Sequence, residues 1–120
     1  MTEYLLRLPW PPAELHSNSR AHWAQKARAA KEYKHAAWAL AKKQYVTRMP
    51  AARIEFTYCP PDRRRRDAQN MPAALKAAID GIALAMRCDD HGFQCLFPMT
   101  FAEPVNGGAV LAHIKPGGVE

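Results

Sequence analysis

The sequence predicts an α+β fold: a small mixed sheet, a long N-terminal helix and a second helix packed on it, and a C-terminal β-hairpin. Three observations lead to this prediction. Short segments alternate apolar and polar residues, two longer segments carry apolar residues at helical spacing, and an Asn-Gly-Gly turn lies near the C-terminus. With 120 residues the chain can bury one core, so residues 1–120 are expected to form a single domain.

The N-terminal part is predicted to form a strand and then a long helix. Residues 4–8 favour a strand, which the prolines that follow it would end. The helix is expected over about residues 20–46, with Ser17 or Ser19 as its N-cap. Its apolar face would consist mostly of small side chains. The members of this face are Trp23 and four alanines, Ala27, Ala30, Ala37 and Ala41.

After Pro50 the pattern changes to the period of a strand and then to that of a second helix. Residues 53–58 alternate polar and apolar side chains, which indicates a strand with one buried face. The second helix is expected to begin near Asn70, a plausible N-cap, with Pro72 tolerated in its first turn. One apolar stripe runs along it, made of Met71, Leu75, Ile79, Ile82 and Met86. Lys76 and Asp80 lie four residues apart beside this stripe, so they are expected to share a flank of the helix and to pair with each other.

The C-terminal part is expected to form a hairpin. Residues 87–92 would end the second helix, and residues 93–101 and 109–115 resemble strands. The turn at 106–108 would join these two strands, and Pro98 places its strand at an edge or at a bulge.

The charge distribution favours a polyanionic partner. The formal net charge is +6. Eight of the 17 basic residues lie within residues 20–48, where Glu32 is the only acidic residue, and four more form the run at 63–66. The lysines of the long helix that are expected to contact DNA are Lys26, Lys31 and Lys34.

The three cysteines indicate a reducing compartment. Their number is odd, and the sequence shows no signal peptide and no apolar run that could cross a bilayer, so a cytoplasmic location is expected. A zinc site from Cys88, His91 and Cys95 would have three ligands, one fewer than a structural site needs. Small buried thiols are the preferred interpretation.

The most informative stretch is residues 61–70, in which four arginines lie between two aspartates ahead of the second helix. The arginine side chain binds phosphate oxygens bidentately, and a nearby carboxylate can hold a hard divalent cation. This combination suits phosphodiester chemistry on a nucleic acid. The alternative is a solvated charge run on a loop.

These residues resemble the RusA family of Holliday-junction resolvases, which are crossover junction endodeoxyribonucleases, in the same order and at similar spacing. The resemblance covers essentially the whole chain, and residues 17–23 resemble phage and prophage members. The matching positions are Leu8-Pro9-Trp10-Pro11-Pro12, Pro61 to Asp67, Asn70, Lys76, Asp80 and the Asp89-Asp90 pair.

The resemblance implies a homodimeric, magnesium-dependent endonuclease of recombination and repair, acting in a bacterial or phage-infected cell. Such an enzyme binds four-way DNA junctions and nicks two strands symmetrically. By position, Asp67 and Asp90 would be metal-binding carboxylates, and Lys76 would stabilise the transition state or the leaving oxygen. The junction arms would be held by the basic helix and by Arg63, Arg64, Arg65 and Arg66.

One position departs from the family pattern. The family has a carboxylate two residues after its first aspartate, and this chain has Gln69 there. An amide can still offer its carbonyl oxygen to Mg²⁺, but it removes one negative charge. Asp89 or Asp62 would replace the missing carboxylate if the fold brought either close.

Simpler interpretations remain open at this point. Asp67 would then be a carboxylate that pairs with a neighbouring arginine, and Asp90 an ordinary loop residue. The whole protein would then be a catalytically weak or inactive protein that binds junctions or other structured DNA. A small sequence-specific DNA binder is a third possibility, although no helix-turn-helix or zinc-finger pattern is present.

Overall fold

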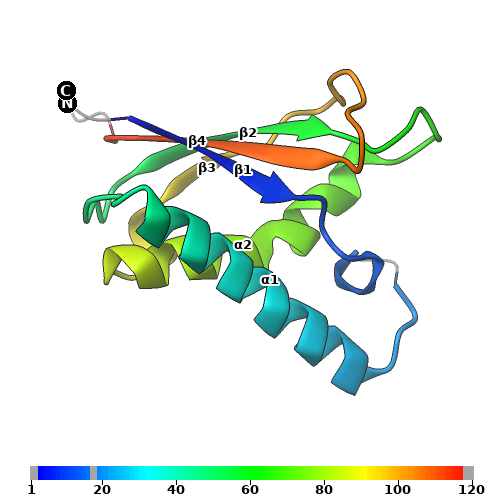
Figure 1. Ribbon diagram of the computed structural model, residues 1–120, viewed down its shortest axis with the longest axis horizontal. Helices are drawn as coiled ribbons and strands as arrows, with labels where there is room; N and C mark the ends of the chain where they lie inside the picture. The colour runs from blue at the N-terminus through cyan, green and yellow to red at the C-terminus, as the bar shows by residue number, and fades with distance from the viewer. Residues whose placement is uncertain (1–2, 17–18, 118–120) are drawn as a thin grey trace.

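The computed structural model describes residues 3–16 and 19–117, and within them two α-helices cover one face of a four-stranded sheet (Figure 1). This arrangement confirms the predicted α+β class. Ser17, one of the two expected caps, lies outside the described residues. The elements in chain order are β1 (Tyr4–Pro9), η1 (Ala13–Leu15), α1 (Trp23–Lys43), β2 (Arg53–Cys59), η2 (Ala68–Asn70), α2 (Met71–Met86), η3 (Asp90–Gly92), β3 (Gln94–Leu96) and β4 (Ala109–Lys115).

The sheet is mixed, with strand order β1-β4-β2-β3. Strand β4 runs antiparallel to both of its neighbours, whereas β3 runs parallel to β2. The predicted C-terminal hairpin is therefore wrong, because β3 and β4 lie on opposite sides of β2. Strand β3 ends before Pro98 and forms an edge of the sheet, as the proline indicated.

Aromatic contacts explain why residues 97–101 follow β2 and form no hairpin. The ring of Phe97 stacks on Phe56 with 5.2 Å between centroids, and the ring of Phe101 lies 5.8 Å from that of Tyr58. The glycine turn exists, with φ of +78° at Gly107 and +76° at Gly108. It directs the chain into β4, which inserts between β1 and β2.

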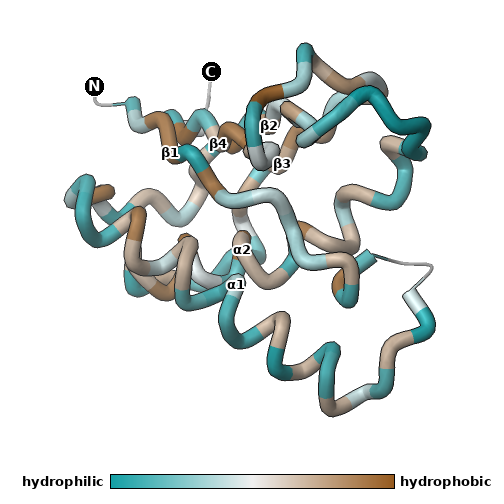
Figure 2. The backbone as a smooth tube through the Cα atoms, turned by 45° about the vertical axis from the view of Figure 1, so that its right-hand side comes forward, coloured by the Kyte–Doolittle hydropathy of each residue, from teal (hydrophilic) through white to brown (hydrophobic). Residues whose placement is uncertain are grey.

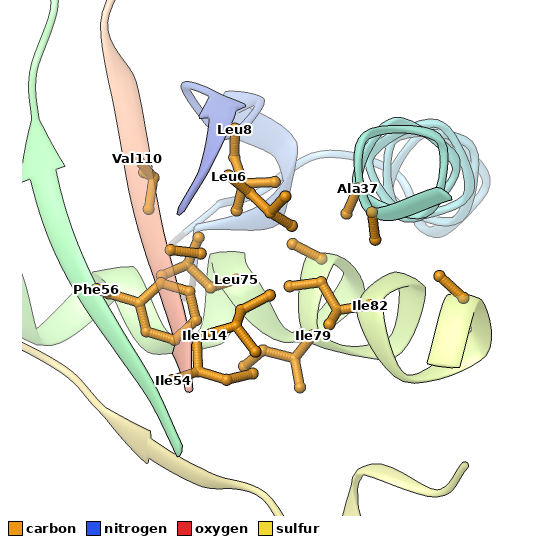
Figure 3. Close-up of a cluster of buried hydrophobic side chains, with 14 of the residues drawn as sticks. Leu6, Leu8, Ala37, Ile54, Phe56, Leu75, Ile79, Ile82, Val110 and Ile114 are labelled. Atoms are coloured by element: carbon orange, nitrogen blue, oxygen red, sulfur yellow. The ribbon is translucent and has the colours of Figure 1, made fainter. Parts of the chain in front are cut away.

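The core lies between the sheet and the two helices (Figure 3). The alternation predicted for β2 is confirmed, because its apolar side chains point to the helices and are buried. In β1 and β4 alternate residues are buried as well, whereas Leu5 on the outer face of β1 is exposed. The buried strand residues in this core are Leu6, Leu8, Ile54, Phe56, Tyr58, Val110, Ala112 and Ile114.

Helix α2 contributes the apolar stripe that the sequence predicted. All five of its predicted members are buried, so this face of the helix forms part of the core. The helix begins at Met71, directly after Asn70, as predicted. A further side-chain cap precedes it, because Asp67 Oδ1 accepts a hydrogen bond from the backbone N of Gln69 and thereby caps η2. Arg87 ends α2 in the left-handed conformation, with φ of +59°.

Helix α1 begins at Trp23, and the cap predicted for it is wrong, whereas the predicted buried face is confirmed only at Ala37 and Ala41. His22 is the N-cap: its Nδ1 accepts a hydrogen bond from the backbone N of Ala24 at 3.1 Å, while Ser19 Oγ accepts from Ala21. Trp23 is 74% exposed because the first turns of α1 extend away from the sheet (Figure 1). The buried residues recur every fourth position, at Ala29, Tyr33, Ala37 and Ala41.

The two helices approach each other closely at Gly81. A Cβ atom at this position would collide with the carbonyl oxygen of Lys34 and would lie 3.1 Å from the backbone N of Trp38. The contact is backbone to backbone, so no side chain can rotate away from it. No helix in the described part of the chain is long and apolar enough to span a membrane.

We predict that Gly81→Ala destabilises the protein. At an exposed helix position alanine is more favourable than glycine by about 1 kcal/mol. At Gly81 the collision with α1 should outweigh this gain and lower the free energy of unfolding by about 1–3 kcal/mol. The measurement is urea unfolding, with Ala39→Gly on the exposed side of α1 as the control for helix propensity alone. A stabilised Gly81→Ala protein would contradict the close contact.

Candidate functional site

The arginine segment, residues 62–67, leaves the end of β2 as a continuous hydrophilic stretch (Figure 2). Asp62 organises it. One carboxylate oxygen, Oδ1, accepts a hydrogen bond from the backbone N of Arg64 at 2.9 Å and pairs with Arg66 Nη2 at 2.9 Å. The backbone hydrogen bond from Arg64, and then the guanidinium of Arg66, hold the pKa of Asp62 below its usual value. Asp62 therefore stays ionised and fixes the start of the segment.

Arg66 is the most rigidly held of the four arginines. Its side chain is 19% exposed, and its Nη1 donates to the carbonyl oxygens of Asp62 at 3.1 Å and Arg64 at 3.0 Å. The guanidinium also lies over the ring of Trp10, 5.7 Å from the centroid. A freely solvated charge run does not describe this residue.

The other three arginines are exposed and can exchange partners. Arg63 pairs with Glu103 at 2.6 Å, and Arg64 lies 3.9 Å from Asp62, but these arginine side chains are 76% and 80% exposed. Exposed pairs of this kind contribute little stability, so a phosphate can replace the carboxylate at low cost. Arg65 makes no ion pair with any described residue and lies beside a pocket.

An open groove separates the arginine segment from residues 97–101. Its larger part has a volume of about 830 Å³, and its lining includes Arg65, Arg66 and Asp67 as well as Met99 to Phe101. A smaller part of about 330 Å³ adjoins it, because Asp67 and Met99 line both. Gln69 lies in the smaller part. The groove therefore brings cationic, carboxylate and apolar side chains together.

Asp67 has a local structural role in addition to its position in this groove. Its Oδ1 accepts from Gln69 N at 3.0 Å, as described for the cap of η2. The ion pair with an arginine that was considered for Asp67 is formed by Asp62. Asp67 is exposed, and its second oxygen has no hydrogen-bond donor among the described residues.

A second cluster lies along α2, where Lys76 bridges two aspartates. Its Nζ lies 2.8 Å from Asp80 Oδ1 and 2.8 Å from Asp90 Oδ2. The pairing of Lys76 with Asp80, four residues apart, was predicted, whereas the bridge to Asp90 was not. The hydrogen bonds to Asp80 and then Asp90 raise the pKa of Lys76, and Lys76 in turn lowers the pKa of Asp90. Asp90 is thus a partner of Lys76, more than an ordinary loop residue.

The residues that the family resemblance implies for magnesium either line the groove or contact Lys76. Asp67 and Gln69 line the groove, whereas Asp90 shares the ammonium group of Lys76 with Asp80. No three His, Cys, Asp or Glu side chains among the described residues are grouped so that they could hold a metal ion. The implied donors are two carboxylates and an amide, which suit an open magnesium site completed by water and substrate phosphates and not a closed cage of protein ligands.

The proposed substitutes for the missing carboxylate are engaged elsewhere. Asp62 pairs with arginines, and Asp89 Oδ1 accepts from the backbone N of His91. Cys88, His91 and Cys95, which are all described residues, are likewise not grouped so that they could hold a metal ion. Cys59 is buried as expected, but the other two thiols are half-buried.

The basic helix contributes further positive charge. Lys31 and Lys34 are exposed on α1, while Lys26 is half-buried and its Nζ donates to the carbonyl oxygen of Ser19 at 3.0 Å. The N-terminal half of α1 and the arginine segment lie toward the same end of the molecule (Figures 1 and 2). Both predicted basic regions are therefore available to one extended ligand.

Sequence reasoning missed one wall of the groove. Trp10 was noticed as part of a proline-rich motif, but its contact with Arg66 was not foreseen. Residues 99–101 carry no charge pattern and were predicted to belong to a strand. His16 also lines the groove, although scattered histidines give no signal in the sequence.

We predict that Lys76→Gln raises the pKa of Asp90, because the ammonium group that hydrogen-bonds the carboxylate is removed. The folded-state pKa of Asp90 lies below its unfolded value. The pair therefore stabilises the protein above about pH 4, and this contribution is lost as the pH falls through the folded pKa. Lys76→Gln should cost up to about 1 kcal/mol at pH 7 and nothing at strongly acidic pH, because the pair is exposed.

Carbon-13 NMR titration of the carboxyl groups and urea unfolding in metal-free buffer measure these two effects. Lys42→Gln, at an exposed position on α1, is the control for removal of one positive charge. An Asp90 pKa that is the same in both variants would show that the bridge does not form in solution.

No family model matches the chain. A protein of Xylella fastidiosa (strain Temecula1), described as an uncharacterized protein, is 33% identical to it over 114 residues. That match covers 91% of this chain and 74% of the Xylella protein, so the similarity extends over the sheet, both helices and the groove. The chain therefore belongs to the same family as this Xylella fastidiosa protein.

Proposed function

We propose that this protein is a RusA-type resolvase, which binds four-way DNA junctions as a homodimer and nicks them in a magnesium-dependent reaction. The arginine segment is the observation that carries the proposal. It combines one arginine held rigidly by Asp62 and Trp10 with three exposed arginines beside a carboxylate-lined groove. Phosphates approaching this end of the molecule would meet preorganised donors.

The binding half of the proposal rests on the placement of charge. The arginine segment and the N-terminal half of α1, which includes Lys26 and Lys31, lie toward the same end of the molecule, and the net charge is +6. Contacts to several phosphates release counterions, which gives affinity without base recognition. A second copy related by a two-fold axis would offer the same surface to the opposite arms, which suits a junction of four arms.

The hydrolytic half rests on the family resemblance and on two carboxylates that are kept ionised or exposed. Asp67 lies in the groove beside Arg65 and Arg66, and Lys76 holds Asp90 in its charged form. Bound magnesium would supply the activation of water for phosphodiester hydrolysis. The chain's own contribution is to position the phosphates with its arginines and to place Lys76 near the cleavage step.

The second candidate is a junction-binding protein that cleaves weakly or not at all. One observation favours it specifically. Gln69 stands where the RusA family has a carboxylate, Asp90 is paired with Lys76, and no three His, Cys, Asp or Glu side chains among the described residues are grouped so that they could hold a metal ion. The two candidates share the DNA-binding surface and differ in the product.

We predict that the protein binds a four-way junction more tightly than a linear duplex of the same length, with two chains per junction. Affinity should fall steeply with salt, and Arg65→Gln should reduce the slope of log K against log [salt] by about 0.9, the contribution of one phosphate contact. Arg7→Gln, on the face of β1 away from the helices, is the matched control and should leave the slope unchanged. Gel-shift titrations across salt and sedimentation measure both quantities; equal affinity for duplex and junction would contradict the proposal.

A cleavage assay separates the two candidates. In Mg²⁺ the enzyme should give symmetric nicks in a labelled junction, Asp67→Asn should reduce their rate by a factor on the order of 100 or more, and Gln69→Asp should raise it. Junction binding should survive in both variants, because the arginines are intact. A gel shift without product from the wild-type chain, together with product from Gln69→Asp, would identify a binder whose metal site is incomplete. Cleavage that neither variant alters would show that the carboxylates are assigned wrongly.

A further inference from the structure

The groove beside the arginine segment is lined by apolar as well as cationic side chains, and binding of a regular duplex would use only the cationic ones. Its lining includes a charged part, Arg65 and Arg66, called here the charged wall, and an apolar part, Met99 and Phe101, called here the apolar wall. Phosphates alone require the first wall, because a duplex presents only its charged backbone to a surface of this kind. The apolar wall requires a ligand with an exposed flat, apolar part.

The apolar wall is built from side chains that are held in place. The ring of Phe101 packs against those of Trp10, at 6.4 Å, and Tyr58, at 5.8 Å. The guanidinium of Arg66 also lies over the ring of Trp10. Trp10 therefore contacts both Arg66 of the charged wall and Phe101 of the apolar wall. The relative position of the two walls is therefore fixed before a ligand binds, which lowers the entropic cost of binding.

Met99 completes the apolar wall at the rim of the groove. It is 78% exposed, and it lines both the larger and the smaller part. A flexible thioether at such a position adapts to flat ligands and contacts aromatic rings favourably. An exposed large apolar residue beside a cationic segment is a feature that core packing does not explain.

The polar groups between the walls suit a nucleobase. Burial, and then the charge of Arg66, lower the pKa of His16, so its imidazole is neutral at pH 7. A neutral imidazole both donates and accepts hydrogen bonds, as does the hydroxyl of Thr100, which also lines the groove. The volume of the larger part, about 830 Å³, lies within the range of small-ligand sites, roughly 300–1,000 Å³.

We propose that this groove receives one nucleotide that has left the base stack at the branch point of the junction. The phosphate would lie on Arg65, and the base would lie against Phe101 and Met99. This inference rests on the proposed function, and it adds the feature of the substrate that the groove selects. Paired and stacked bases in a linear duplex cannot present a face to the apolar wall, whereas bases at a branch point or in a single strand can.

A fluorescent base at the branch point tests the inference. The probe is a four-way junction with 2-aminopurine at that position, compared with the same strand in a linear duplex, at protein concentrations that saturate each DNA. Fluorescence should rise on binding to the junction and stay constant for the duplex. Met99→Ala and Phe101→Leu should lose most of the rise, whereas Leu84→Ala, an exposed apolar position on α2 that does not line the groove, should keep it.

An abasic nucleotide at the same position provides a second measurement. Removing the base should weaken binding by the wild-type chain about tenfold, the scale of one base stacked on an aromatic ring. In the Phe101→Leu and Met99→Ala variants, removing the base should weaken DNA binding little further. The base and the mutated side chain would contact each other, so the loss of affinity from removing one is not added to the loss from removing the other. Met99 is exposed, so Met99→Ala keeps the test valid if Phe101→Leu does not fold.

A single-stranded oligonucleotide containing 2-aminopurine separates the two proposals. Junction binding without a fluorescence rise, or a full rise in Met99→Ala, would overturn the nucleotide groove and leave the resolvase proposal standing. A rise with the single strand that depends on Met99, without any binding to the junction, would support the groove and overturn the resolvase proposal. Binding to neither DNA would overturn both.

Discussion

The contact between α1 and α2 at Gly81 is the constraint on which the rest of the structure depends. Because α2 has no side chain at that point, its backbone meets the Lys34 carbonyl oxygen of α1 directly. Two helices at this separation fit side by side on one face of a narrow four-stranded sheet (Figure 3). Helix α2 is thereby fixed with its N-terminus beside the end of β2, where the arginine segment begins. The position of the candidate site follows from the packing of the helices.

The charges at this end of the molecule fall into two kinds. Arg66 is held by a carboxylate, two carbonyl oxygens and an aromatic ring, and it has little freedom to follow a ligand. The exposed arginines around it make weak pairs or none with described residues, so they can reach phosphates at different positions. A fixed cation sets the register of a bound backbone, and mobile cations add affinity. The same segment can therefore orient DNA and tolerate its shape.

The carboxylates are divided between two places, and this division shapes the functional proposal. Asp67 faces the groove, while Asp90 shares the ammonium group of Lys76 with Asp80. The ammonium supplies the positive charge that lies between the aspartates of α2 and η3. In the proposed function, DNA binding would depend on the arginines and α1, and hydrolysis would depend on the aspartates, so the two properties could be lost separately. Gln69 lies in the groove with Asp67, where a change of one charge would act on the proposed hydrolysis.

The sequence by itself determined the elements whose patterns are local. The alternation of Ile54, Phe56 and Tyr58 identified β2, and the stripe of α2 was correct at every position, because burial on one side imposes these periods. It also identified the arginine segment and the pairing of Lys76 with Asp80, which lie four residues apart on a helix. These features need only neighbours along the chain.

The tertiary structure decided everything that joins distant segments. Strand β4 inserts between β1 and β2, which no turn signal predicts, because strand pairing is set by the burial of both partners and by the aromatic rings that hold residues 97–101 along β2. Likewise α1 buries Ala29 and Tyr33 while it exposes Trp23, because α2 covers only the later turns. The bridge from Lys76 to Asp90 and the apolar wall of the groove also join residues far apart in the chain. Such contacts depend on the relative positions of whole elements, and a pattern read along one segment does not contain those positions.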